Sequence, residues 1–300
     1  MHWNRTLAVA LVTGVGSLVT MASAYASVAK HAHSQSIGAP NRGRLEHGVH
    51  LKTSSALRIL PAVAPYDAEW ATEELAEMVE QAAHDVRLHF ADAILTVGQA
   101  SKRAGGEIDR HHSHESGRDI DIAFYLQDAK QKPLLAGGYI TIRNDGWSLD
   151  HHAHFDDARN FALLTSLVNS SHATITHIFV VHYLRARILS YAAKMNASPA
   201  LIDRLASLMV QPAHVLPHDD HFHVRISCPR SSTSCMEWPY VVEKHPQKKE
   251  QPHHGRPTLQ RARSSGRLVD DTNPLSHRRP AEGSLPQLPS IPDLHDSEGI

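Results

Sequence analysis

The chain has 300 residues, of which 41% are hydrophobic and 20% charged, so it is long enough to bury a core in one or two domains. Its 30 basic and 31 acidic residues give a formal net charge of -1. This balance provides no overall positive field, which argues against nucleic acid as a partner. Histidine is frequent, with 25 residues, and this frequency raises the question of metal binding or of a response to pH.

The N-terminus has the pattern of a secretory signal peptide. Arg5 precedes an uncharged run that ends in Ala-Tyr-Ala at 24–26, which fits the small-residue pattern of a cleavage site. We therefore expect residues 1–26 to be removed before Ser27 and the protein to be exported. An uncleaved anchor is the alternative, because the run is just long enough to span a bilayer. Its many small and hydroxylated residues make it weakly apolar, so no stable membrane anchor is expected.

Hydrophobic periodicity predicts a mixture of helices and strands beyond this segment. Residues 27–61 show no sustained period and are interpreted as an extended or loop-forming arm. The elements that follow, in chain order, are a helix over 67–90, a strand over 94–97, a strand over 118–124, a helix over 156–168, a strand over 174–181, helices over 183–193 and 199–209, and a strand over 222–227.

The composition changes after this last strand. Residues 241–300 are rich in Pro, Lys, Arg, His, Ser and Gln and hold few large apolar residues. Such a segment cannot bury enough surface to offset its chain entropy, which predicts a disordered tail. The chain then divides into a signal peptide over 1–26, one folded α+β domain over 27–240 and the tail over 241–300.

Two cysteines, Cys228 and Cys235, enclose a short loop rich in Ser and Thr. In an oxidising compartment this close spacing favours a local disulfide, with two free thiols as the alternative. A zinc site built on them is less favoured, because the chain has no second pair of cysteines.

Two of the predicted strands alternate between apolar and polar side chains. In the first, Ile120 and Ile122 lie on one face and Asp119 and Asp121 on the other. The second alternates in the same way, with one face formed by Phe222, Val224 and Ile226 and the other by His223, Arg225 and Ser227. Each strand therefore presents a polar edge opposite a stripe that faces the core.

Clusters of metal-ligand side chains adjoin both strands, over 111–121 and over 218–223. A catalytic zinc ion usually has three protein ligands drawn from His and carboxylate, and its fourth position holds water. A histidine before the first strand, a carboxylate on that strand and a histidine on the second would converge if the two strands pair. The histidines at 151, 152 and 154 form another dense group, which we interpret as a solvated loop.

The two clusters resemble the penicillin-insensitive murein endopeptidases, which belong to the LAS group of zinc metallopeptidases. The resemblance covers most of residues 36–236 and rests on two motifs, His111-x-Ser113-His114-x-x-Gly117-x-Asp119-x-Asp121-Ile122 and His221-x-His223-Val224-Arg225-x-x-Cys228-Pro229. It implies an α+β fold in which a small antiparallel sheet carries a zinc site and is flanked by helices.

The resemblance also implies roles for individual residues. His114, Asp121 and His223 become the zinc ligands, and His221 becomes the general base or an electrostatic partner. His111 and His218 become further active-site histidines that polarise the scissile carbonyl, stabilise the oxyanion or support a ligand. Asp119 is expected to be a surface charge or a partner of the neighbouring loop, although it shares a face with Asp121 and could replace it at the metal.

The implied activity is hydrolysis of the D-alanyl-diaminopimelyl crosslinks of peptidoglycan in the periplasm, by water that a zinc ion activates. A D,D-carboxypeptidase or dipeptidase on the same fold is one alternative. A non-catalytic periplasmic zinc-binding module, using the many histidines, is another.

Overall fold

The computed structural model describes residues 32–109, 111, 113–213 and 215–237. The predicted signal peptide over 1–26 and the predicted tail over 241–300 lie outside these residues. Across the part that is described, no helix is both long enough and apolar enough to cross a membrane.

The four predicted helices are present, and a side-chain cap marks the start of three of them, the first, the second and the fourth. Thr72 caps the first helix by accepting a hydrogen bond from the Leu75 amide, and Asp156 caps the second in the same way through the Arg159 amide. The helices are α1 (Glu73–His89), α2 (Asp157–Asn169), α3 (His182–Lys194) and α4 (Pro199–Leu208). The prediction began α1 six residues too early, because Trp70 and Ala71 form a strand instead.

The described strands form four sheets. The largest has six strands in the order β12-β11-β13-β7-β6-β4, and the smaller ones pair β1 with β2, β3 with β5, and β10-β8-β9. The strands of the large sheet are β4 (Leu57–Ile59), β6 (Leu95–Val97), β7 (Asp119–Ala123), β11 (Ile175–Phe179), β12 (Met209–Val210) and β13 (His221–Ile226). The others are β1 (Gln35–Ala39), β2 (Arg42–Glu46), β3 (Val49–His50), β5 (Trp70–Ala71), β8 (Leu126–Gln127), β9 (Pro133–Leu134) and β10 (His154–Phe155), with one 3-10 helix, η1 (Ala64–Tyr66).

The predicted α+β class is confirmed, and the four central strands of the large sheet are antiparallel. The pairs at its two edges, β4 with β6 and β11 with β12, are parallel, so the sheet as a whole is mixed. Both parallel pairs join strands that are separated in sequence by a helix, α1 in one case and the α3–α4 pair in the other.

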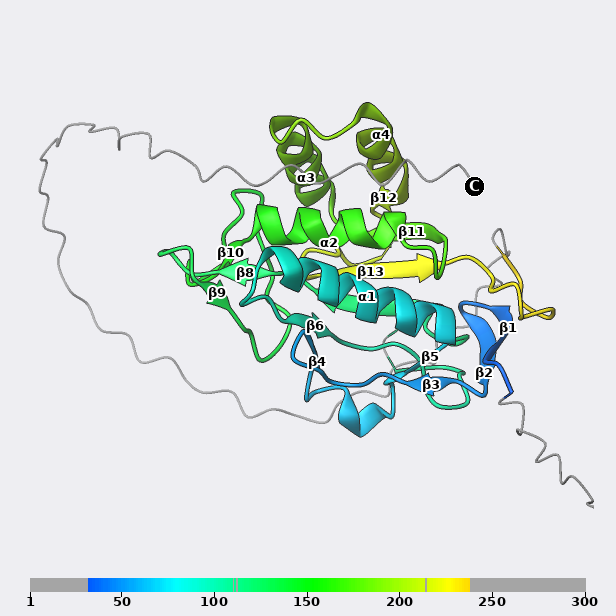
Figure 1. Cartoon of the computed structure of the whole chain (residues 1–300). Helices are drawn as coiled ribbons and strands as arrows, with labels where there is room; N and C mark the ends of the chain where they lie inside the picture. Colours follow the sequence, from blue (N-terminus) through cyan, green and yellow to red (C-terminus); the bar gives the residue numbers. More distant parts are fainter. Residues whose placement is uncertain (1–31, 110, 112, 214, 238–300) are drawn as a thin grey trace, which may run out of the picture. The chain divides into compact units, whose positions relative to one another are not determined.

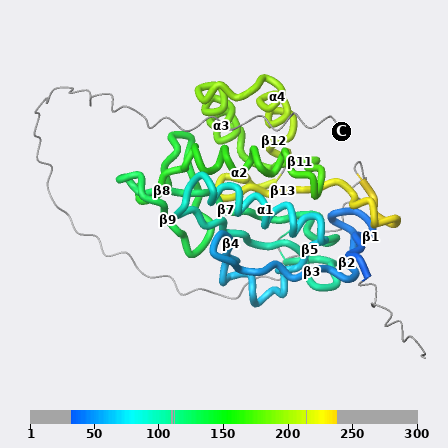
Figure 2. The backbone as a smooth tube through the Cα atoms, viewed as in Figure 1, coloured from blue at the N-terminus to red at the C-terminus, as the bar shows by residue number. Residues whose placement is uncertain are grey.

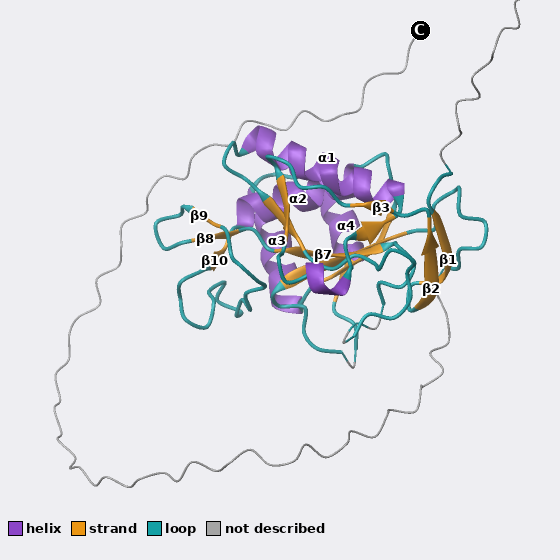
Figure 3. Ribbon diagram, turned by 90° about the horizontal axis from the view of Figure 1, so that it is seen from below, coloured by secondary structure: helices purple, strands orange, loops and turns teal. Residues whose placement is uncertain are grey.

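One face of the large sheet packs against the helices. Ile120 and Ile122 of β7 and Phe222 and Val224 of β13 are fully buried in a core shared with α1, α2 and α3. Figures 1 and 3 show α1 and α2 lying along the strands on this one side. The predicted alternation is thus correct, because the apolar side chains of both strands point to the helices.

The arm predicted over 27–61 is more structured than its sequence indicated. It contributes the β1–β2 hairpin and two further strands, β3 and β4. Figure 2 shows the hairpin beside the segment that follows β13, where Gly38 exchanges backbone hydrogen bonds with Ser234 and Met236. The predicted disulfide between Cys228 and Cys235 closes that segment. Strands β1 to β4 are short and hold few apolar residues, so no periodic pattern in the sequence predicts them.

Two leucines of α1 provide a matched test of this core. Leu75 is fully buried, whereas Leu88 is 70% exposed on the same helix. We expect Leu75→Ala to lower the free energy of unfolding by about 2–5 kcal/mol, because it leaves a cavity. The control Leu88→Ala should change it by less than about 0.5 kcal/mol. Denaturant unfolding followed by circular dichroism measures both, and equal losses would contradict this packing.

Candidate metal centre

The polar face of the large sheet carries two rows of side chains that cross β7, β13 and β11. In the first row Asp121 lies opposite His223, which lies opposite Phe179. The second row, one pleat further along, is formed in the same order by Asp119, Arg225 and His177. Strand alternation places both rows on the face that the helices do not cover.

His114 reaches the first row from the loop before β7. Its backbone has a φ of 72°, a left-handed conformation that is uncommon for residues other than glycine. The Ser101 hydroxyl holds this turn, since it donates to the His114 carbonyl at 2.6 Å and accepts from the Gly117 amide at 2.8 Å. The His114 ring Nδ1 lies 2.8 Å from the Ala100 carbonyl oxygen, which orients Nε2 toward Asp121.

His223 is oriented by Asp119. The His223 Nε2 lies 2.7 Å from Asp119 Oδ1, and the same oxygen accepts from Arg225 Nε at 2.6 Å. The other ring nitrogen, Nδ1, then faces Asp121 Oδ1 at 3.3 Å. The prediction that Asp119 is a surface charge or a loop partner is wrong: its side chain is fully buried and contacts strand β13.

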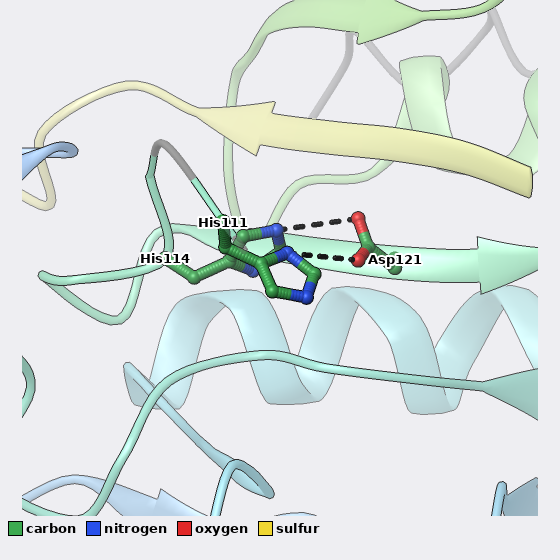
Figure 4. Close-up of side chains that lie close together, drawn as sticks. All are labelled: His111, His114 and Asp121. Carbon is green, nitrogen blue, oxygen red and sulfur yellow. Dashed lines mark ion pairs between the residues drawn. The ribbon is translucent and has the colours of Figure 1, made fainter. Parts of the chain in front are cut away.

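Asp121 is the common neighbour of four histidines. His114 Nε2 and His223 Nδ1 each lie 3.3 Å from Asp121 Oδ1, His221 Nε2 lies 3.4 Å from it, and His111 Nδ1 lies 3.7 Å from Oδ2. Figure 4 shows the rings of His111 and His114 directed at this carboxylate. Ligand atoms of His111, His114 and Asp121 all lie within 4.8 Å of one another, close enough to hold one metal ion.

Unsatisfied atoms in this cluster fit a metal ion. Among the described residues, both carboxylate oxygens of Asp121 and the Nε2 of His114 are buried without a hydrogen-bond partner. Buried polar atoms are normally satisfied, and several lone pairs that face one another at this distance suit a shared cation. Asp119 has only one such oxygen, since the other is taken by Arg225 and His223. Asp121 is therefore the better candidate ligand of the two carboxylates.

His221 and His218 complete the cluster from the β13 side. His221 Nδ1 lies 2.5 Å from Asp220 Oδ1, so its Nε2 faces the Asp121 carboxylate. The Tyr139 ring packs on His221 with centroids 4.8 Å apart, and its hydroxyl donates to Gln99 Oε1 at 3.2 Å. His218 lies beside His221, with ring centroids 5.3 Å apart.

The histidines of the cluster divide by their pKa values. Burial lowers the pKa of His111 and of His218 to about 4, and the neighbouring histidines add to this effect. Burial also opposes charge on His221, but Asp121 and Asp220 outweigh it and raise the pKa of His221 to about 10. For Asp121 burial favours the neutral acid, yet the surrounding histidines hold its pKa well below the usual range.

The six site residues predicted from the sequence therefore meet in one place. Those predicted as ligands are His114, Asp121 and His223, and those predicted as catalytic are His111, His218 and His221. Sequence reasoning missed Tyr139, Phe179 and Ser101. Nothing in the local sequence marks these three residues, because each acts through a contact with a distant segment.

The class of protein that this fold and site define is an α+β protein with a His/Asp cluster on the sheet face that the helices do not cover. A family profile described as penicillin-insensitive murein endopeptidase matches residues 36–251. The chain belongs to this family of peptidases. No curated protein matches the chain significantly.

The buried contact between Asp119 and Arg225 can be tested without any metal. We expect Asp119→Ala to lower the free energy of unfolding by about 3–5 kcal/mol, because it leaves a buried guanidinium without its partner. Asp203→Ala removes an exposed carboxylate of α4 and should change it by less than about 0.5 kcal/mol. Denaturant unfolding in the presence of a chelator provides the measurement. Equal midpoints for the two variants would refute the role given to Asp119.

Proposed function

We propose that this protein is a zinc-dependent murein endopeptidase that hydrolyses D-alanyl-diaminopimelyl crosslinks of peptidoglycan. The observation that carries the proposal is the buried Asp121 carboxylate, which has no hydrogen-bond partner among the described residues and lies among four histidines on the sheet face that the helices do not cover. Membership of a murein endopeptidase family supports the substrate class.

For the zinc ligands we propose His114, Asp121 and His223. Tetrahedral ligands at the usual zinc distances of about 2.0–2.1 Å stand about 3.3 Å from one another. The distances from Asp121 Oδ1 to the facing nitrogens of His114 and His223 are both 3.3 Å. In each of these two rings the other nitrogen contacts a fixed oxygen, that of Ala100 or of Asp119, as is usual for metal-bound histidine.

His111 is the competing third ligand, because it also reaches Asp121. Its side chain is 24% exposed and lies at the edge of the cluster, whereas His223 is almost fully buried. We therefore assign His223 to the metal and His111 to the substrate side of the site.

The remaining chemistry follows from the positions of the side chains. A bound zinc ion would lower the pKa of a water molecule on it to about 7 and polarise the scissile carbonyl. A cation on Asp121 would offset the carboxylate charge that raises the pKa of His221, so that the His221 Nε2, with its ring oriented by Asp220, could accept a proton from water and deliver it to the leaving amine. We assign His218 and His111 to hydrogen bonding with the developing oxyanion. No covalent intermediate with the protein is needed.

Export to the periplasm completes the proposal. The signal-peptide pattern over 1–26 and the Cys228–Cys235 disulfide both fit an oxidising compartment outside the cytoplasm. Peptidoglycan would be reached there, and the domain over 27–240 would act on it.

Zinc content and turnover test the proposed roles separately. We expect the mature chain to bind one zinc ion and to release muropeptides from crosslinked sacculi. Asp121→Ala should lose both the metal and the activity. His221→Ala should keep the zinc and lose about 10²- to 10⁴-fold in rate, because proton transfer is impaired. Zinc analysis and chromatography of the released muropeptides provide the two measurements.

His172→Ala is the matched control, since His172 is an exposed histidine whose partner is Glu77, on helix α1. It should match the parent chain in zinc content and in rate. Release from uncrosslinked muropeptides alone would instead favour the D,D-carboxypeptidase. Several loosely bound metal ions with no release would favour the zinc-binding module.

A second prediction separates the two candidate third ligands. His223→Ala should weaken zinc binding by more than about 100-fold, whereas His111→Ala should leave the affinity within about tenfold and reduce the rate. Competition with a coloured chelator measures the affinities. The reverse order of affinities would assign His111 to the metal.

A further inference from the structure

The second row of the polar face borders a cavity that the proposed chemistry does not use. The cavity has a volume of about 310 Å³, and its lining consists of Pro40, Thr176, His177, Arg225 and Glu237. Arg225 and His177 are register partners on β13 and β11, one pleat along from His223 and Phe179. The cavity therefore adjoins the metal row on the same sheet face.

Arg225 is the cationic group of this cavity, and contacts with Asp119 and Phe179 fix the position of its guanidinium. Its Nε donates to Asp119 Oδ1 at 2.6 Å, and its guanidinium carbon lies 5.4 Å from the Phe179 ring centroid. Among the described residues, this is the one hydrogen bond that the guanidinium makes. Its Nη groups remain available for the planar, two-bonded contact that guanidinium forms with carboxylate.

The other lining groups of the cavity are mostly polar or charged. Strand β11 has an irregular register between Ile175 and His177, and Thr176, which lies at this bulge, lines the cavity. The Thr176 hydroxyl lies 3.1 Å from His177 Nδ1, so these two side chains form one polar wall. Glu237 adds a negative charge that is tied to the buried Arg118 at 3.2 Å. A cationic and an anionic group thus border one cavity.

We propose that this cavity binds the free carboxylate that flanks the scissile nitrogen of the crosslink, with Arg225 as the specificity-determining residue. The inference rests on the proposed function and names the part of the substrate that the site recognises. In a D-alanyl-diaminopimelyl crosslink, the carbon that bears the leaving nitrogen also bears a free carboxylate. That carboxylate stands about one residue length, roughly 3.5 Å, from the scissile carbon.

The spacing of the two rows matches this substrate. Side chains two residues apart on a strand are separated by about 6.6 Å. One residue length of substrate and one charge-assisted hydrogen bond of about 2.8 Å together cover that spacing. A scissile carbonyl at Asp121 and His223 therefore brings its neighbouring carboxylate within reach of Arg225.

The test compares two crosslinked muropeptide dimers, one with this carboxylate free and one with it amidated. The zinc-loaded mature chain should cleave the free acid with a kcat/KM about 10- to 100-fold higher, since hydrogen bonds between charged groups are worth that much in affinity. Arg225→Gln should reduce this preference to near unity, whatever its effect on the absolute rate. Arg204→Gln, at an exposed arginine of α4, is the matched control and should keep the preference.

A binding measurement tests the carboxylate site at Arg225 independently of the proposed endopeptidase activity. Calorimetry is performed with an uncleaved peptide that ends in diaminopimelic acid, either free or amidated. Equal cleavage of the two dimers by the parent chain would overturn the carboxylate site and leave the endopeptidase standing. Tighter binding of the free peptide that depends on Arg225, without cleavage of either dimer, would overturn the endopeptidase and leave the site. If the parent chain showed no preference for the free peptide and cleaved neither dimer, both the carboxylate site and the endopeptidase would be overturned.

Discussion

The antiparallel pairing of β7 with β13 is the constraint on which both the core and the site depend. Asp121 lies opposite His223, and Ile122 lies opposite Phe222 in the same ladder. Because side chains alternate along a strand, one register buries the apolar stripe under the helices and brings Asp121 and His223 together on the other face. A slip of one residue would place the carboxylates in the core and the isoleucines in the site. Burial of the apolar side chains and convergence of the polar ones therefore require the same register of β7 and β13.

Two buried carboxylates on one short strand are costly unless each has compensating partners. Asp119 is compensated by Arg225 and by His223 Nε2, both on the neighbouring strand. Asp121 faces imidazole rings, and neither of its oxygens makes a hydrogen bond within the described part of the chain. The two carboxylates are close in sequence and alike in burial, yet among the described residues one is paired by hydrogen bonds and the oxygens of the other are not. This difference gives them separate roles.

Loops outside the large sheet supply further side chains to the cluster around Asp121. The left-handed turn at His114 brings a ring from outside the ladder to the open face, and Ser101 holds that turn through two hydrogen bonds. On the opposite side, Tyr139 packs against His221, and its hydroxyl occupies the space that a Cβ on residue 98 would need, so glycine is required there. Strained or glycine-dependent positions of this kind are common where reactive groups must be held in place. The cavity at Arg225 lies further along the same face.

By itself the sequence determined the helices, the two alternating strands, the disulfide and the six clustered residues, because each depends on local periodicity or on motif spacing. It left open which of the two carboxylates is paired within the protein, and it gave no sign of Tyr139, Phe179 or the strands before residue 60. Only the tertiary structure decided these points. Strand register, ring packing and the partner of a buried charge depend on segments that are far apart in the sequence, such as those of Asp119 and Arg225, and no local pattern records which of them will meet.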